Sequence, residues 1–166
     1  MEDEKREGSC MPAASVFKRY AFFGSYDHTL DAKGRIIIPT AYRKPLGESF
    51  TITLSPDDKG IALYPDAAFE RMVEELLRLN SRDLDVQKQI NHIAKYSFPG
   101  TQADPQGRVL LPVCLRQYVL EDVKELEISG ALDYVRIVPR ATGTEDDVYY
   151  KKNREAILNK IAELNA

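Results

Sequence analysis

Two different spacings of apolar residues occur along the chain, and they predict blocks of strands separated by helices. Short apolar or alternating runs bounded by turn-forming residues are typical of strands. Eight such runs occur, at residues 22–30, 35–38, 50–54, 61–64, 96–103, 108–111, 126–129 and 134–138. Because Arg35–Ile38 contains three consecutive apolar residues, we expect this strand to be buried on both faces.

A helical spacing of three and four appears between residues 66 and 95 and predicts a helical hairpin. The first helix begins near Asp66, and the second ends near Lys95. The apolar stripe of the first helix comprises Phe69, Met72, Val73, Leu76 and Leu77. Asn80 and Ser81 interrupt the pattern, and residues of these types are suited to capping the second helix.

Two further helical segments are predicted. Residues 40–44 are long enough for one short helical turn. A final helix is expected from about Glu145 to Glu163, because Thr144 and Asp147 stand at the spacing of a capping box. Its apolar stripe comprises Ile157, Ile161 and Leu164.

A segment of thirteen residues occurs twice. The sequence DAKGRIIIPTAYR at 31–43 matches DPQGRVLLPVCLR at 104–116 with a constant offset of 73 residues and no gap. Five positions are identical, and the apolar triplet between them is apolar in both copies. A period this long that is present only twice indicates one folding unit duplicated in tandem, not a solenoid. Any surface built from the two copies is therefore nearly two-fold symmetric, and duplex DNA is a common symmetric partner.

Each copy begins with the chemistry of a tight turn. Asp31 and Asp104 can accept hydrogen bonds from the backbone that follows them, and Gly34 and Gly107 accept a positive φ. Half a chain of about four short strands is too small to bury both faces of its sheet. Two halves wrapped around each other could close a small barrel and remove the exposed edges.

Composition and charge narrow the function classes. With 43% hydrophobic and 30% charged residues, the chain is expected to fold around a core. The net charge is −3, but residues 12–46 carry +4 and residues 93–120 carry +2, while the other segments total −9. The two repeats are thus the basic parts of an acidic protein, and such local patches decide whether phosphate can approach.

Other chemistries find little support in the sequence. The cysteines, Cys10 and Cys114, have no partner at metal-ligand spacing, and Cys114 is expected to be a small buried side chain. Asp31 and Asp104 could form a carboxylate pair, but no nucleophile and base arrangement or phosphate-binding glycine loop accompanies them. We therefore expect no enzyme, metal, cofactor or small-molecule substrate. Without a bilayer-length apolar run or an apolar leader, we expect a cytoplasmic protein with no membrane partner.

The duplicated D-x-x-G-R motif, followed by three apolar residues and proline, resembles the swapped-hairpin DNA-binding fold of the AbrB type. Two copies separated by a helical hairpin resemble the MraZ family of bacterial transcriptional regulators, over roughly residues 22–165. The resemblance implies a pseudo-dimer within one chain and assembly into a ring. It also implies binding to tandem promoter repeats of the protein's own division and cell-wall operon, usually as a repressor, and a place at the nucleoid.

The expected fold class is α+β, mainly β: a duplicated AbrB-like swapped-hairpin barrel with a helical hairpin between the repeats and a C-terminal helix. The expected segments are an N-terminal extension at 1–21, repeat 1 at 25–68, a helical linker at 69–96, repeat 2 at 97–140, and the helix at 141–166.

Five basic residues are the candidate DNA contacts, namely Arg35, Arg108, Lys33, Arg43 and Arg116. A guanidinium can fork onto the O6 and N7 atoms of guanine, and lysine suits a phosphate. The alternatives are a structural Asp–Arg pair within each turn, and structural salt bridges for the two later arginines. The expected function is sequence-specific promoter binding by a homo-oligomer. The alternative is an AbrB-like interaction module without DNA affinity. The first interpretation requires Arg35 and Arg108 to face solvent on one surface.

Overall fold

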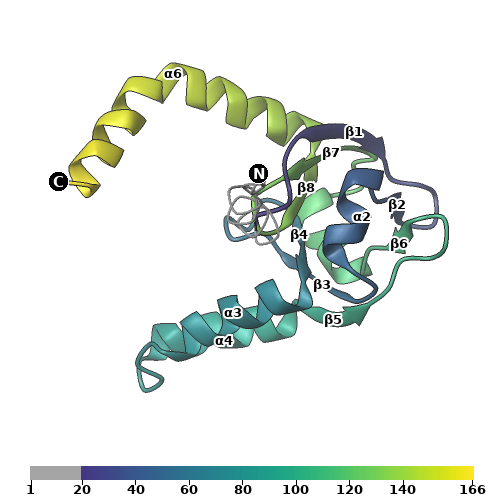
Figure 1. Cartoon of the computed structure of the whole chain (residues 1–166), viewed down its shortest axis with the longest axis horizontal. Coiled ribbons are helices and arrows are strands. Elements are labelled where there is room, and N and C mark those ends of the chain that lie inside the picture. The colour runs from purple at the N-terminus through teal and green to yellow at the C-terminus, as the bar shows by residue number, and fades with distance from the viewer. Residues whose placement is uncertain (1–19) are drawn as a thin grey trace, which may run out of the picture.

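A computed structural model of the chain describes residues 20–166 (Figure 1). The expected N-terminal extension therefore lies outside the described residues except for its last two positions, as does Cys10. Within the described range the body of the protein is built on β-sheet, with helices between and after the strands.

All eight predicted strands are present, with small shifts at their ends. They are β1 (Ser25–Thr29), β2 (Arg35–Ile37), β3 (Phe50–Leu54), β4 (Ile61–Pro65), β5 (Phe98–Thr101), β6 (Arg108–Leu110), β7 (Glu125–Gly130) and β8 (Val135–Pro139). The helical segments are α2 (Thr40–Leu46), α3 (Asp66–Leu77), α4 (Leu84–Lys95), α5 (Val113–Leu115), the π-helical turn η1 (Arg116–Leu120) and α6 (Arg140–Leu164). The turns α5 and η1 follow the second repeat as α2 follows the first, and the sequence analysis missed them.

The strand order shows how the two repeats are combined. Six strands form one antiparallel sheet in the order β1-β7-β8-β4-β3-β5, and β2 pairs with β6 in a separate ribbon. The strands that correspond in the two repeats are β1 and β5, β2 and β6, β3 and β7, and β4 and β8. If each strand of the sheet is replaced by its counterpart, the same order is read from the opposite edge. The first strand of each repeat pairs with the third strand of the other, so the halves exchange strands instead of folding side by side.

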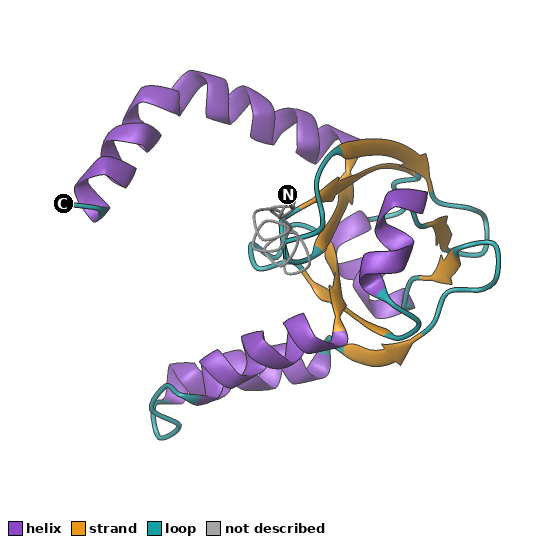
Figure 2. Ribbon diagram, in the orientation of Figure 1, coloured by secondary structure: helices purple, strands orange, loops and turns teal. Residues whose placement is uncertain are grey.

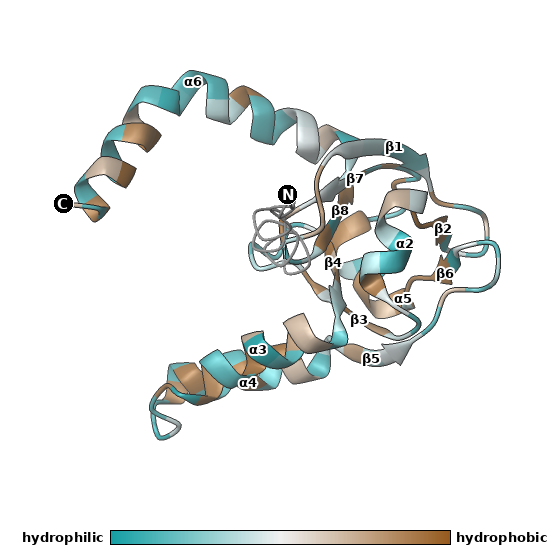
Figure 3. Cartoon of the chain, viewed as in Figure 1, coloured by the Kyte–Doolittle hydropathy of each residue, from teal (hydrophilic) through white to brown (hydrophobic). Residues whose placement is uncertain are grey.

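The hydrogen-bonded sheet is open. Its two ends are β1 and β5, and it curves around the short helices α2 and α5 without a ladder that joins those ends (Figures 2 and 3). The expectation of a closed barrel was wrong in this respect, because the second strand of each repeat leaves the sheet to form the ribbon.

One core serves both repeats. Ile36, Ile52 and Leu63 of the first repeat belong to the same buried cluster as Val109 and Ile137 of the second. Burying side chains of this size contributes about 1.5–3 kcal/mol each. Neither half covers these side chains alone, so the stability of each repeat depends on the other.

The ribbon buries only one of its faces. Ile36 and Val109 are almost fully buried beneath it, whereas Ile37 and Leu110 are exposed. The expectation that Arg35–Ile38 is buried on both faces was therefore wrong. A ribbon of two strands has the core on one side only, and side chains alternate between its faces.

The helices α3 and α4 form the predicted hairpin, which projects from the body opposite the ribbon, and α6 also extends away from the body (Figure 1). Two predicted caps were wrong. Asp83, not Asn80 or Ser81, caps α4 by accepting from the N–H groups of Asp85 and Val86. The final helix begins at Arg140, directly after Pro139, which ends β8 and occupies the N-cap position of α6 with an extended backbone (φ −53°, ψ 140°).

Two residue-level details complete the fold. Cys114 is exposed, which contradicts its predicted burial, because it faces outward on α5. In the range 20–166, no helix combines the length and the apolar character that crossing a membrane requires.

Candidate nucleic-acid interface

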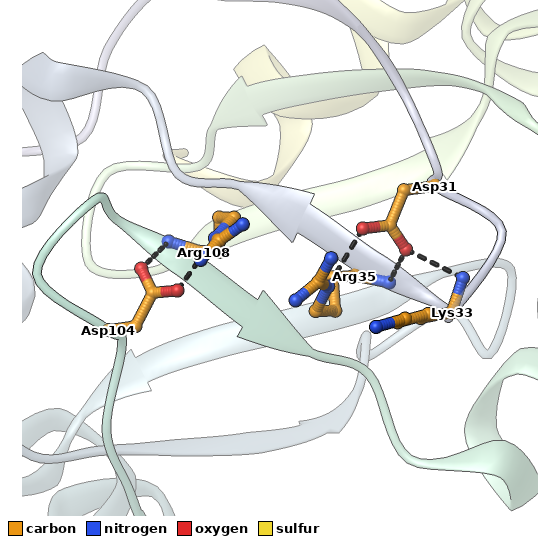
Figure 4. Close-up of polar contacts among 5 residues, drawn as sticks. All are labelled: Asp31, Lys33, Arg35, Asp104 and Arg108. Carbon is orange, nitrogen blue, oxygen red and sulfur yellow. Dashed lines mark hydrogen bonds and ion pairs between the residues drawn. The ribbon is translucent and has the colours of Figure 1, made fainter.

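Asp31 organises the turn before β2. Its Oδ1 atom accepts hydrogen bonds from the backbone N–H groups of Lys33 (2.9 Å) and Arg35 (2.8 Å), and its Oδ2 atom accepts from Arg35 Nε at 2.8 Å (Figure 4). Gly34, at φ 82°, donates its N–H to the Asp31 carbonyl. One carboxylate therefore fixes both the backbone and the side chain of Arg35.

The second copy repeats this geometry. Asp104 Oδ1 accepts from the N–H groups of Gln106 (2.9 Å) and Arg108 (2.8 Å), and Oδ2 accepts from Arg108 Nε at 2.7 Å (Figure 4). Gly107 closes the turn at φ 80°. The structural Asp–Arg pair considered from the sequence is thus present in both repeats.

The two aspartates are held in their charged form. The backbone N–H of Arg35 that bonds the Asp31 carboxylate, supported by the Arg35 side chain, lowers the pKa of Asp31 below its usual value. Arg108 lowers the pKa of Asp104 in the same way, again chiefly through its backbone N–H. Both guanidinium groups therefore keep their ionised partners at neutral pH.

Arg35 and Arg108 share the solvent-facing side of the ribbon. Their side chains are 30% and 36% exposed. In the antiparallel register Arg35 lies opposite Leu110, and Arg108 lies opposite Ile37. Residues at these positions point to the same face, and diagonal neighbours are about 7–8 Å apart. The requirement that both arginines face solvent on one surface is met.

The register also fixes the symmetry of this face. Ile36 pairs with Val109, its own equivalent in the other repeat, so the approximate two-fold axis passes through this pair. The Nη atoms of Arg35 and Arg108 make no hydrogen bond to any part of the chain from residue 20 onward, since only their Nε atoms bond the aspartates. The ribbon therefore offers two pre-oriented guanidinium groups related by an approximate two-fold axis.

Lys33 makes the two halves unequal. It lies exposed on the first turn, on the same side of the ribbon as Arg35, while Gln106 occupies the equivalent position in the second turn (Figure 4). The first turn carries one more positive charge than the second, which would favour phosphate contact on that side.

Arg43 and Arg116 connect the repeats. Arg43 Nε donates to the carbonyl of Ile38 at 2.9 Å, and Arg116 Nε donates to the carbonyl of Leu111 at 2.9 Å. Each guanidinium packs on the turn of the opposite repeat. A Cβ atom added to Gly107 would lie 2.4 Å from Arg43 Cζ. The sequence analysis considered structural salt bridges as the alternative role for Arg43 and Arg116. Both side chains do make structural contacts, but each hydrogen bond is to a backbone carbonyl and not to a carboxylate.

The sequence analysis missed two residues of this face, Ile37 and Leu110. A signal for them was available. Side chains alternate along a strand, so an exposed Arg35 implies an exposed residue two positions later. The apolar identity of Ile37 concealed this pattern.

In the described part of the chain, no group of three or more His, Cys, Asp or Glu side chains is placed to hold a metal ion. Asp31 and Asp104, considered as a carboxylate pair, each bond the arginine of their own turn. Both are therefore occupied in holding the turns.

The chain is similar in sequence to proteins of one named family. A family model described as "MraZ protein, putative antitoxin-like" matches residues 21–89. A protein of Lachnoclostridium phytofermentans named "Transcriptional regulator MraZ" is 35% identical over 119 residues, which cover 70% of this chain and 79% of that protein. Proteins of the same name from Moorella thermoacetica and Acetivibrio thermocellus are each 33% identical over 147 residues, covering 87% and 86% of this chain and 99% and 98% of theirs.

Proposed function

The chain belongs to the MraZ family, whose named relatives are transcriptional regulators and not enzymes, and on that premise we propose that it binds promoter DNA through the ribbon of β2 and β6. The observation that carries the proposal is the pair of partly exposed arginines, Arg35 and Arg108, on one face of this ribbon. The major groove of B-DNA admits a two-stranded ribbon, and arginine is the commonest side chain to read guanine there.

The five basic residues take different parts in this proposal. Arg35 and Arg108 contact base edges, and Lys33 contacts a phosphate. Arg43 and Arg116 contribute positive charge to the same end of the molecule while they brace the turns. We also assign each repeat to the AbrB-like swapped-hairpin type, because the observed exchange of strands between the repeats is what that fold requires.

We further propose that several copies assemble into a ring through the helical arms, which are the hairpin of α3 and α4 and the helix α6. Apolar side chains are exposed far from the ribbon, on the hairpin and along α6 (Figure 3). They include Leu77, Leu79, Leu84, Tyr149, Ile161 and Leu164. Exposed apolar surface of this kind marks protein contacts. A ring presents many weakly binding ribbons together, so tandem promoter repeats spaced by about one helical turn, ~10 bp, would bind it tightly.

The proposed consequence is repression. A nucleoid-associated ring bound to direct repeats upstream of its own division and cell-wall operon would block access of the polymerase. The direct test is a mobility-shift titration of the full chain on DNA from upstream of its own gene, at several salt concentrations. A shuffled duplex of the same length is the control. Preference for the upstream duplex, with affinity falling linearly on a logarithmic salt scale, is the expected result.

The second candidate is an AbrB-like interaction module without DNA affinity. The family description contains the term "antitoxin-like", and antitoxins are interaction modules of this kind. An arm that wraps a toxin would be extended and irregular, whereas α6 is a regular helix of 25 residues. Equal and weak binding to the upstream and shuffled duplexes would favour this second function.

A further inference from the structure

Ile37 and Leu110 are large apolar side chains on the same face of the ribbon as the two arginines. They are 47% and 57% exposed. We infer that they contact the 5-methyl groups of thymine, so that the ribbon reads A·T pairs beside the guanines read by Arg35 and Arg108. This inference rests on the proposed DNA-binding function and adds the base type that the apolar positions select.

The register places each apolar side chain beside an arginine. Ile37 is directly opposite Arg108, and Leu110 is directly opposite Arg35. Side chains at directly opposite positions have Cβ atoms about 4.5–5.5 Å apart. Successive bases of one strand are about 3.4 Å apart along the axis. When an arginine forks onto a guanine, its apolar neighbour therefore reaches the next base pair.

The chemistry of the major groove selects thymine at that position. Of the four bases, only thymine presents an apolar group there, its 5-methyl, and apolar side chains contact it. A polar base edge beside Ile37 or Leu110 would lose water without gaining a hydrogen bond. The two side chains therefore favour an A·T pair and disfavour its competitors.

Single exposed apolar residues are common and need no explanation. Ile37 and Leu110 differ because they occupy equivalent positions in the two repeats, 73 residues apart, on a ribbon that also carries Arg35 and Arg108. The other occupant to consider is a second copy of the chain. The basic residues around this apolar pair match the charge of DNA phosphates, and apolar surface for subunit contact is available on the arms at the other end (Figures 1 and 3).

The test uses one upstream duplex prepared in two forms, amplified with dTTP or with dUTP, since uracil is thymine without the methyl group. Wild type is compared with the double variant Ile37→Ser and Leu110→Ser. A Leu132→Ser variant, altered at an exposed leucine in the turn between β7 and β8, is the matched control. Circular dichroism and thermal melting establish that each variant is folded, and light scattering gives its molar mass.

We expect wild type and the Leu132 control to bind the uracil duplex more weakly than the thymine duplex, by about 4-fold for one methyl contact and up to about 15-fold for two. The double variant should bind the thymine duplex more weakly than wild type does and should not distinguish the two duplexes. Equal affinity of wild type for both duplexes would overturn the inference while leaving DNA binding intact.

Two further outcomes also overturn the inference. Discrimination that persists unchanged in the double variant would assign the methyl effect to another residue or to DNA shape. A changed molar mass in the double variant, with discrimination retained, would assign Ile37 and Leu110 to a subunit contact. Failure of wild type to prefer the upstream duplex over a shuffled one would instead contradict the proposed function itself.

Discussion

The guanidinium of Arg116 lies against the backbone of Gly34, although the two residues belong to different repeats. A Cβ atom added to Gly34 would lie 2.4 Å from Arg116 Cζ. Arg43 and Gly107 are related in the same way. The ribbon strengthens this cross-connection, because Ile38 N–H donates to the Gly107 carbonyl at 2.8 Å and Leu111 N–H donates to the Gly34 carbonyl at 3.0 Å. Each arginine-bearing turn is thus held by the other half of the chain.

Gly34→Ala is expected to be more destabilising than a positive φ alone explains. The matched control is the same Gly34→Ala change in an Arg116→Ala background, where the backbone conformation is unchanged and the contact is absent. In that background the change should cost about 1–2 kcal/mol from backbone strain. With Arg116 present, Gly34→Ala should cost at least about 1 kcal/mol more, because the Arg116 side chain must move. Chemical denaturation measures both, and equal costs would show that the Arg116 contact is unimportant.

Arg43 and Arg116 can be tested as braces and as phosphate contacts at once. If Arg43 mainly braces the second turn, Arg43→Ala should lower the melting temperature and weaken DNA binding without changing the salt dependence. Loss of one phosphate contact would instead reduce the slope of log affinity against log salt by about 1. Melting curves and binding titrations across a salt series separate the two roles. An unchanged melting temperature with a reduced slope would favour direct contact.

Arg35→Ala is expected to weaken binding to the upstream duplex by ~1–3 kcal/mol and to reduce its preference over a shuffled duplex, because a base contact is lost. Lys33→Ala should weaken binding to both duplexes alike and reduce the salt slope by about 1. Lys88→Ala on α4, at the far end of the molecule, is the control that removes one positive charge. Preference for the upstream duplex that survives in Arg35→Ala would remove this residue from base recognition.

The variant Asp31→Asn distinguishes two roles of the Asp31 carboxylate, which are to hold the Arg35 side chain in place and to add negative charge near the DNA. Removing a negative charge near DNA should strengthen binding if only the electrostatic field matters. Because the Asp31 carboxylate holds Arg35 Nε, we expect the opposite, a loss of roughly 5- to 30-fold in affinity, as a charge-assisted hydrogen bond is lost. Asp85→Asn, on the exposed surface of α4, makes the same charge change away from the ribbon. Tighter binding by Asp31→Asn would rule out the positioning role.

Glu127 gives a dependence of stability on pH. Burial raises the pKa of its carboxyl, and the negative charge of Asp147 raises it further. Because the pKa of Glu127 is raised in the folded state, the folded protein favours the protonated carboxyl. This contribution to the free energy of unfolding is fully present below the unfolded-state pKa of about 4.3 and is lost as the pH rises through the folded-state pKa. Glu127→Gln should therefore stabilise the protein at pH 7 by less than about 1 kcal/mol, since solvent screens this partly exposed group.

The stabilisation by Glu127→Gln should disappear below about pH 4, where the glutamate is protonated in both states. Thermal melting across pH 3.5–8 measures the effect, with the exposed Glu163→Gln as the control. A variant that is less stable than wild type at pH 7 would contradict the assigned sign.

Much of the local structure follows from residues close together in the chain. Asp31 and Gly34 predict the turn, because an aspartate that accepts from the following N–H groups and a glycine at positive φ are local devices. The helical hairpin follows from the apolar spacing between Phe69 and Leu77. The start of α6 does not follow from the local sequence. The capping pattern at Thr144 predicts a later start, but the helix begins at Arg140, directly after Pro139.

The sequence by itself determined that a unit is duplicated, that each copy ends its turn with an arginine, and which segments form strands. Tertiary structure alone decided that the sheet stays open, and that Ile37 and Leu110 face solvent while Ile36 and Val109 are buried. It also decided that Arg43 and Arg116 brace the opposite turns. The physical reason is that turn and helix signals act over a few residues, whereas burial depends on which strand, dozens of residues away, covers each face.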